Sequence, residues 1–203
     1  MIPVWSVTLL MVFLQCGEGE RQTETEDPIS QHAREFSPDE RSAYLKSGGE
    51  LTAAVFNLLS GELMTAMGEK GFEGALEYCN LNALSLTDSV AELHGARVAR
   101  LAERYRNPEN ALVDSLDMEV YKKYLQMSGD RLDESSKIYR TADNSVLYYR
   151  PIVLQGQCVV CHGPKSTIGE DHYESIKSIY PEDKAIGFKP GDLRGMWRVE
   201  WVE

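Results

Sequence analysis

One short stretch of the sequence combines residue types that can hold a metal cofactor covalently. Gln157 is followed by Cys158, two valines, Cys161, His162 and Gly163, which is a C-x-x-C-H pattern. Two thiols one helical turn apart can add to the two vinyl groups of a haem, and the adjacent histidine is then placed to bind iron from the proximal face. The spacing therefore predicts one covalently attached c-type haem, with Cys158 and Cys161 as thioether residues and His162 as an axial iron ligand.

Two other kinds of site also use a C-x-x-C pair. Thioredoxin-like redox proteins place it at a helix N-terminus early in a βαβ unit, whereas here it follows a predicted hairpin late in the chain. A structural zinc site needs four Cys or His ligands, and the sequence has no second C-x-x-C and no H-x-x-x-H pair. Haem attachment is therefore favoured over both alternatives.

The N-terminal residues predict export. Residues 2–14 form an uncharged apolar run that is too short to span a bilayer, as in a signal peptide. The run ends at Cys16-Gly17, and the order Phe13-Leu14-Gln15-Cys16 resembles the bacterial lipobox, where a peptidase cuts before a lipid-modified cysteine. We expect residues 1–15 to be a lipoprotein-type signal peptide and a lipid on Cys16 to anchor the chain on the periplasmic side of a bacterial membrane. Because no Lys or Arg precedes the run and Gln15 is bulky, an ordinary signal peptide or a retained anchor with an incidental cysteine is the alternative.

The composition limits the possible partners. The chain has 203 residues, of which 42% are hydrophobic and 26% charged, a balance typical of a soluble globular domain. Its formal net charge of −11 argues against nucleic acid, because such binding depends on Lys and Arg that neutralise phosphates. Residues 16–47 are polar and acidic and are expected to form a flexible tether, which leaves residues 48–203 as one folded domain.

The hydrophobic pattern changes period along this domain. Three- and four-residue steps predict helices over residues 51–67, 76–90 and 117–127, and glycines at 68, 71 and 95 mark the ends of the first two. Residues 137–141 and 145–154 read as a hairpin, and residues 197–201 alternate as a strand does. We therefore expect an α+β fold, with a long N-terminal helix and a small antiparallel sheet that has helices on one side.

The cysteine count leaves one thiol without a role. Cys16 is assigned to lipid and Cys158 and Cys161 to haem, so Cys79, on the apolar face of a predicted helix, has no partner. It is either a small buried hydrophobe or the second axial iron ligand. The rival ligands are His94, His172, Met67, Met118 and Met127.

Four stretches in the same order resemble a known family, namely the bacterial c-type haem family with a PAS-like fold. That family includes small exported proteins and sensor domains of membrane histidine kinases. The stretches are Ala75 to Cys79, Arg106 to Asn110, Tyr149 to Gly163, and Tyr180 to Phe188 with Gly191 to Gly195. The resemblance covers about residues 48–203. The small hydroxyl residues expected before Arg106 are missing.

The resemblance implies a PAS-like sheet and places Cys79 opposite His162 as the second axial ligand. A thiolate opposite histidine favours ferric iron, so a low reduction potential is expected. We expect a redox or gas/ligand sensor that signals through a separate protein partner, with a low-potential electron-transfer cytochrome as the alternative. Binding of carbon monoxide by the reduced protein separates the two. No distal His and Arg pair of the kind a peroxidase needs is visible in the sequence, so an enzyme is not expected.

Overall fold

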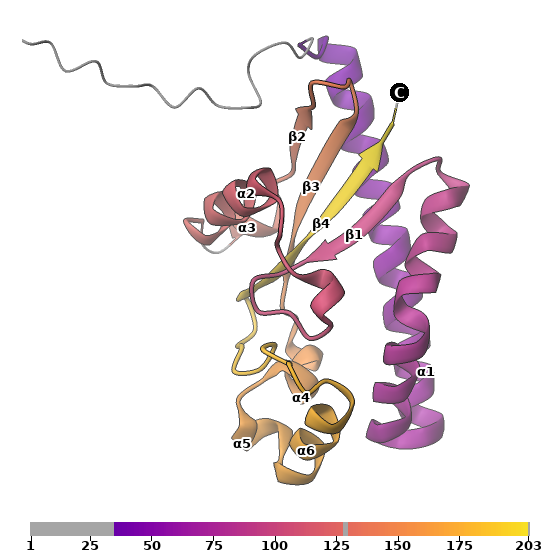
Figure 1. Cartoon of the computed structure of the whole chain (residues 1–203), viewed down its shortest axis with the longest axis vertical. Coiled ribbons are helices and arrows are strands. Elements are labelled where there is room, and N and C mark those ends of the chain that lie inside the picture. The colour runs from indigo at the N-terminus through magenta and orange to yellow at the C-terminus, as the bar shows by residue number, and fades with distance from the viewer. Residues whose placement is uncertain (1–34, 128–129, 203) are drawn as a thin grey trace, which may run out of the picture.

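The computed structural model describes residues 35–127 and 130–202 (Figure 1). The predicted signal peptide, Cys16 and most of the predicted tether lie outside these residues. The helices are α1 (Pro38–Leu93), α2 (Ser115–Leu125), α3 (Asp130–Asp133), α4 (Val159–His162), α5 (Lys165–Ile168) and α6 (Glu170–Ile179), with 3-10 turns at Pro108–Asn110 and Gly156–Cys158. The strands are β1 (Arg97–Leu101), β2 (Lys137–Arg140), β3 (Val146–Val153) and β4 (Leu193–Trp201). No helix of the described residues has the length and apolar character needed to cross a membrane.

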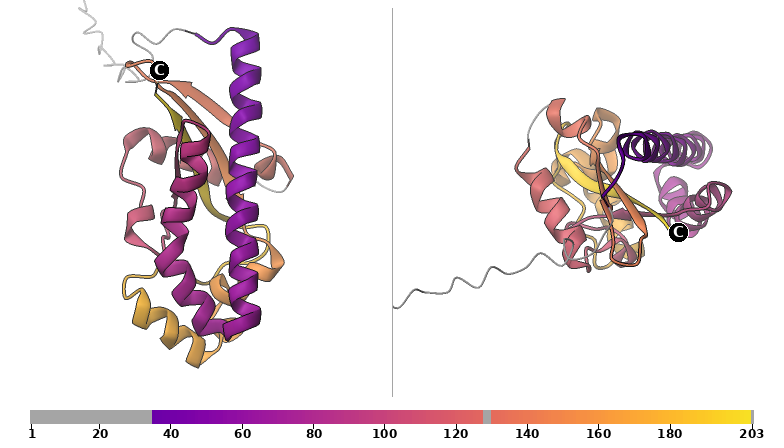
Figure 2. Two further views of the ribbon diagram at one scale, coloured as in Figure 1. Left: turned by 90° about the vertical axis from the view of Figure 1, so that its right-hand side faces the viewer. Right: turned by 90° about the horizontal axis from the view of Figure 1, so that it is seen from above.

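Helix α1 is a hairpin of two antiparallel arms, residues 38–70 and 72–93, as Figure 2 shows. The chain reverses at Gly71, whose φ of 70° and ψ of −165° are open to glycine and strained for other residues. The expected break near Gly71 is confirmed, and so is the end near Gly95, since α1 finishes at Leu93. The two predicted helices are thus the two arms of α1.

The predicted tether is wrong at its C-terminal end, because residues 38–47 form the first turns of α1. Ser37 caps the helix: its Oγ accepts a hydrogen bond from the Glu40 amide at 3.3 Å, and the Glu40 carboxylate accepts one from the Ser37 amide at 2.9 Å. Pro38 sits in the first turn, where its missing N–H costs nothing. A polar composition suggested a coil, but these capping residues start a helix whose later turns are anchored by packing.

The four strands form one antiparallel sheet in the order β1-β4-β3-β2. The predicted hairpin is β2–β3, and the predicted terminal strand is β4, which lies in the middle of the sheet. The sequence pattern missed β1, which reads Arg-Val-Ala-Arg-Leu and lacks a clear apolar alternation. It joins the sheet through pairing with β4, for example Val98 opposite Val199. The α+β class is confirmed.

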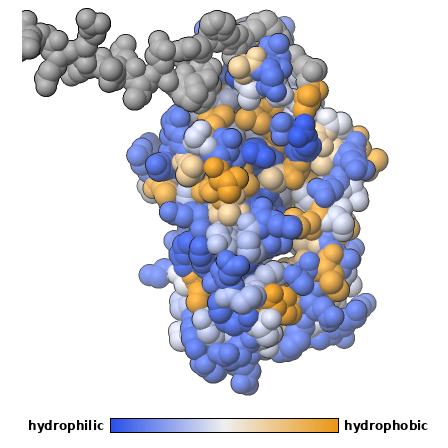
Figure 3. All heavy atoms as spheres, viewed as in Figure 1, coloured by the Kyte–Doolittle hydropathy of each residue, from blue (hydrophilic) through white to orange (hydrophobic). Residues whose placement is uncertain are grey.

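Helices cover both faces of the sheet, so the expectation of helices on one side is wrong. Side chains alternate along β3: Tyr148 packs with α1, whereas Tyr149 packs with α2 and α3 on the opposite face. Tyr149 also donates a hydrogen bond of 2.7 Å to buried Asp117 of α2, which accepts a second from Arg198 of β4 at 2.8 Å. Burial raises the pKa of Asp117 against these two bonds. The structure therefore has three layers. On the face that Figure 3 shows, hydrophilic residues are interspersed with apolar patches.

The segment between β3 and β4 folds at one end of the sheet, beside the turn of the α1 hairpin (Figure 1). Phe72 and Leu76 of α1 pack against Ile176 of α6 and against Tyr180, which follows it. This apolar cluster fixes the position of α4 to α6 relative to the second arm of α1. It thereby sets the distance between two elements far apart in the sequence.

Substituting two neighbouring glycines tests the packing of α1 on the sheet. A Cβ at Gly48 would lie 2.4 Å from the fully buried ring of Tyr148, whereas one at Gly49 would meet only the Tyr148 hydroxyl, at 3.8 Å. Gly48→Ala should therefore lower the free energy of unfolding by about 2 kcal/mol. Gly49→Ala should raise it by about 0.5 kcal/mol, because alanine favours the helix. Urea denaturation measures both, and equal effects would contradict this packing.

Candidate functional site

The C-x-x-C-H stretch forms a tight helical turn directly after the sheet. β3 ends at an irregularity between Ile152 and Val153, and backbone hydrogen bonds between Leu154 and the loop before β4 hold the chain as it leaves the sheet. The residues 156–162 then wind through a 3-10 turn into α4. Gly163 closes the turn: a Cβ there would lie 2.5 Å from the Val159 carbonyl oxygen. The close approach explains why glycine follows the histidine.

One hydrogen bond sets the chemical state of His162. Its Nδ1 lies 2.7 Å from the carbonyl oxygen of Ala185, and because a carbonyl only accepts, Nδ1 is the donor. The neutral ring then carries its lone pair on Nε2, the form that binds a metal. Burial also lowers the pKa of His162 well below its usual value, so the ring stays neutral. The Phe188 amide donates to the His162 carbonyl at 2.9 Å and holds the backbone in register.

Arg106 ties this turn to the loop that supplies Ala185. Its guanidinium donates to the Cys161 carbonyl at 2.7 Å and to the Asp183 carboxylate at 3.1 Å. Asp183 in turn accepts a hydrogen bond from the Ala185 amide at 3.0 Å, and its side chain is fully buried. The carbonyl that orients His162 is therefore positioned by a buried ion pair. Sequence reasoning placed Arg106 in a matching stretch but gave it no role.

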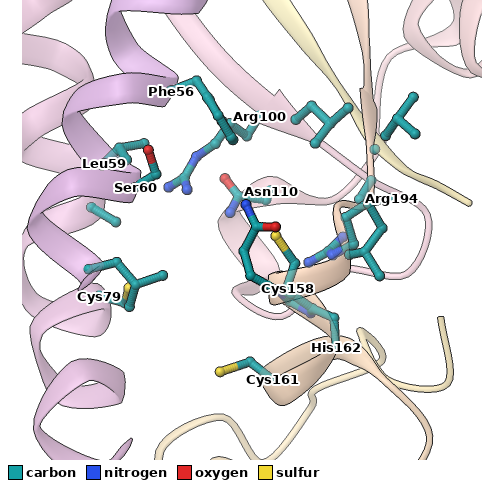
Figure 4. A pocket seen from close by; sticks show the side chains of 18 of the residues that line it. Phe56, Leu59, Ser60, Cys79, Arg100, Asn110, Cys158, Cys161, His162 and Arg194 are labelled. Atoms are coloured by element: carbon teal, nitrogen blue, oxygen red, sulfur yellow. The ribbon is translucent and has the colours of Figure 1, made fainter. Parts of the chain in front are cut away.

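Cys79 lies across a cavity from the C-x-x-C-H turn (Figure 4). The cavity has a volume of about 300 Å³ and is lined mostly by apolar side chains of both α1 arms, the sheet and the turn. Cys79, Cys158, Cys161 and His162 all line it, and the three cysteines are free thiols. The structure thus brings together residues separated by about eighty positions, as the resemblance implied.

Burial raises the pKa of the Cys79 thiol, and Arg100 and Arg106 oppose that shift. Burial likewise raises the pKa of Cys161. A buried thiol becomes a thiolate readily only beside further positive charge, which a metal ion supplies. The two arginines supply part of it from the protein itself.

The rival ligands separate clearly by position. Met67 lines the same cavity as Cys79. His172 stacks on Phe72 with ring centroids 3.9 Å apart, and its Nδ1 donates to the Ile168 carbonyl at 3.2 Å. The remaining three do not line the cavity: His94 is an exposed helix end, Met118 is 39% exposed and Met127 packs beside α2.

The two alternative uses of the C-x-x-C pair fit the geometry poorly. The sheet is antiparallel throughout, so the pair is not part of a βαβ unit. Over residues 35–127 and 130–202, no three or more His, Cys, Asp or Glu side chains converge as a metal-ion site. His162 is instead oriented by the Ala185 carbonyl, and its Nε2 lies beside a cavity large enough for an organic ligand.

A protein-family model described as Tll0287-like matches residues 20–201. The chain belongs to the Tll0287-like family. Among solved structures, that of the cyanobacterial heme-protein Tll0287 shares 27% sequence identity and a TM-score of 0.59, and the match covers 83% of this chain and 98% of that one. No curated protein sequence matches the chain. These matches confirm one part of the resemblance seen in the sequence, namely that the chain belongs to a family that includes a bacterial haem protein. The PAS-like fold and the link to kinase sensor domains stay predictions.

The cavity lining includes residues that the sequence reasoning did not single out. Asn110 and Arg194 line the cavity, and both lie in stretches that carried the resemblance. Arg100 lines it as well, from the strand β1 that the pattern missed. Its position outside any recognised stretch left no signal in the sequence.

Removing Arg106 tests the support for the His162 turn. The Arg106 and Asp183 side chains are 12% and 0% exposed, so Arg106→Met would leave a buried carboxylate unpaired and should cost about 3 kcal/mol of stability. Arg97→Met is the matched control, since Arg97 is 71% exposed and pairs with Glu200 at 3.9 Å, and its loss should stay within about 0.5 kcal/mol. Urea denaturation compares the two. A loss for Arg106→Met no larger than the control would contradict the structural role of this pair.

Proposed function

We propose that the chain carries one covalent c-type haem, attached to Cys158 and Cys161 and bound by His162. The observation that carries the proposal is the hydrogen bond from His162 Nδ1 to Ala185, which leaves Nε2 available to a metal beside two free thiols on the same turn. The apolar cavity supports it, because such clefts suit a large planar ligand. The name of the related structure, a cyanobacterial heme-protein, supports the same cofactor.

Cys79 is the proposed second axial ligand. It lines the wall opposite His162, on an element that reaches the site independently of the C-x-x-C-H turn (Figure 4). Burial raises the pKa of the Cys79 thiol and Arg100 and Arg106 oppose that shift, so the positive charge of a bound metal ion would be what favours the thiolate. Met67 is the rival that shares this cavity. Thiolate is the stronger donor of the two, so His162/Cys79 ligation is the arrangement we propose.

The proposed role is that of a redox or gas/ligand sensor on the periplasmic side of a bacterial membrane, anchored by a lipid on Cys16. Bound haem would supply a one-electron couple held at low potential by thiolate. Cys79 sits on the second arm of α1, which joins the first arm through the turn at Gly71 and through a hydrogen bond of 2.9 Å from Tyr78 to Glu62. Release of Cys79 on reduction would remove one bond between this arm and the proposed haem. The arm could then change position, and a partner protein could detect that change. A PAS-like domain serving a separate protein partner would fit this role.

An electron-transfer cytochrome is the second candidate. The Val160 side chain, between the two attachment cysteines, is 41% exposed, so the attachment turn reaches the surface where a redox partner could approach. A carrier would keep both axial ligands in both oxidation states, whereas a sensor would release Cys79. Neither role requires the chain to catalyse a reaction.

Covalent attachment is tested first by the mass of the intact protein. After expression with a haem-attachment system, the purified chain should carry the added mass of one haem, retained through acid acetone. Cys158→Ala together with Cys161→Ala should abolish this retained mass, because both thioether bonds are lost. Cys79→Ala should keep it. Haem that acid acetone removes from the unsubstituted chain would refute covalent attachment.

The second ligand is tested by Cys79→Ala, with Met67→Leu as the volume-conserving control at the same cavity. Cys79→Ala should change the low-spin ferric spectrum, raise the reduction potential and admit carbon monoxide to the reduced protein, because a strong donor is lost. Cys79→Ser should have a smaller effect. Electron paramagnetic resonance and optical titration read these changes. An unchanged spectrum in Cys79→Ala with a changed one in Met67→Leu would move the assignment to Met67. Reduced unsubstituted protein that excludes carbon monoxide and nitric oxide would favour electron transfer over sensing.

Lipid anchoring is tested by Cys16→Ser. The substitution should move the protein from the membrane fraction to the soluble fraction, while the haem mass stays intact, since residue 16 lies far in sequence from the site. Incorporation of radiolabelled palmitate is the direct measurement. Cleavage at a residue other than the one before Cys16 would refute lipidation and leave export standing.

A further inference from the structure

The cavity that receives the proposed haem is positively charged in a chain that is acidic overall. Three arginines line it and its smaller extension of about 150 Å³: Arg100, Arg106 and Arg194. No Asp or Glu is among the described residues that line either part. The net charge of the chain is −11, so this concentration of positive charge runs against the composition. An enclosed positive site favours an anionic occupant.

Arg106 is already neutralised by Asp183, as described above. Arg100 is not, because its guanidinium makes no hydrogen bond or ion pair with any of the described residues. It extends from β1 into the cavity, above Cys79 in the view of Figure 4. Burial lowers its pKa, with the charge of Cys79 opposing that shift, so the protein itself compensates this charge poorly.

Arg194 is only partly satisfied. Its Nη1 donates to the Arg104 carbonyl at 3.0 Å, and its guanidinium lies 5.5 Å from the Phe188 ring centroid. Its Nε is buried without a hydrogen-bond partner in the protein. Burial lowers its pKa to about 10. Figure 4 shows its guanidinium facing the cavity beside Cys158 and His162.

A buried donor without a partner, such as Arg194 Nε, is destabilising, and an anion that accepts its hydrogen bond removes that cost. Arg100 adds a positive charge at the same cavity. Arginine presents a planar fork of donors that matches a carboxylate with two parallel hydrogen bonds. The side-chain amide of Asn110 also faces the cavity and makes no hydrogen bond with any described residue. Two open guanidinium groups and one amide therefore suit two carboxylates on one large apolar ligand.

We propose that Arg100 and Arg194 each receive one propionate carboxylate of the haem, with Asn110 as an additional donor. This inference rests on the proposed haem site and goes beyond it, since it assigns the two ends of the ligand that neither the cysteines nor the axial ligands hold. The arginines act as positioning residues: they bind the porphyrin edge that carries the propionates and hold that edge inside the cavity.

The test is resonance Raman spectroscopy of the holoprotein, in which the propionate bending modes report hydrogen bonding to each carboxylate. Arg100→Met and Arg194→Met should each shift one propionate band to lower frequency, and the double variant should shift both, because donors are lost. Arg100→Lys should give a smaller shift, since it keeps the charge but not the fork. Arg97→Met, on the same strand and exposed, is the control and should leave both bands unchanged.

Different results would overturn the role of the arginines and the proposed haem site. Holoprotein whose propionate bands stay in place in both single variants would overturn the role of the arginines and leave the haem site standing. Bands that move equally in Arg97→Met would overturn it as well, because the shift would then report a general disturbance. A chain that takes up no haem under attachment conditions would defeat the haem site itself.

Discussion

The hydrogen bond between His162 and the Ala185 carbonyl is the contact on which the site depends. It decides which ring nitrogen carries the proton and which way the ring faces, and so leaves Nε2 free to bind a metal. The carbonyl is itself held in place, because Asp183 accepts from the Ala185 amide and pairs with Arg106. Arg106 then returns to the turn by binding the Cys161 carbonyl. These five residues form a closed series of interactions in which each group fixes the position of the next.

The opposite wall of the cavity is built independently. Gly71 reverses α1 so that its second arm returns along the first. Cys79 on this arm then faces the C-x-x-C-H turn across the cavity (Figure 4). The cluster of Phe72, Leu76 and Ile176 joins the base of this arm to α6. The two elements that carry the proposed ligands are therefore connected at one end and separated by the cavity at the other. Such an arrangement lets a change in one ligand bond alter the position of a whole helical arm.

The sheet is the rigid element behind both walls. It is covered by α1 on one face and by α2 and α3 on the other, so tyrosines 148 and 149 are buried on opposite faces. Asp117 fixes α2 to two strands through Tyr149 and Arg198. This scaffold allows β1 to hold the charge of Arg100 at the cavity. The apolar lining then makes that charge costly unless an anion is bound.

The sequence by itself determined the features that depend on neighbouring residues. The C-x-x-C-H spacing, the reversal at Gly71, the β2–β3 hairpin and the α+β class all arise from periodicity and turn chemistry within a few residues. The resemblance to a known family also anticipated the facing of Cys79 and His162. Tertiary structure alone decided the rest. Strand β1 forms because β4 pairs with it, the start of α1 at Pro38 is anchored where its later turns pack on Tyr148, and the second sheet face is covered by helices. Tertiary structure also decides that Arg100 lines the cavity without a hydrogen-bond partner among the described residues. These features rest on burial and pairing between distant segments, where local propensity is overridden by the environment that the folded chain supplies.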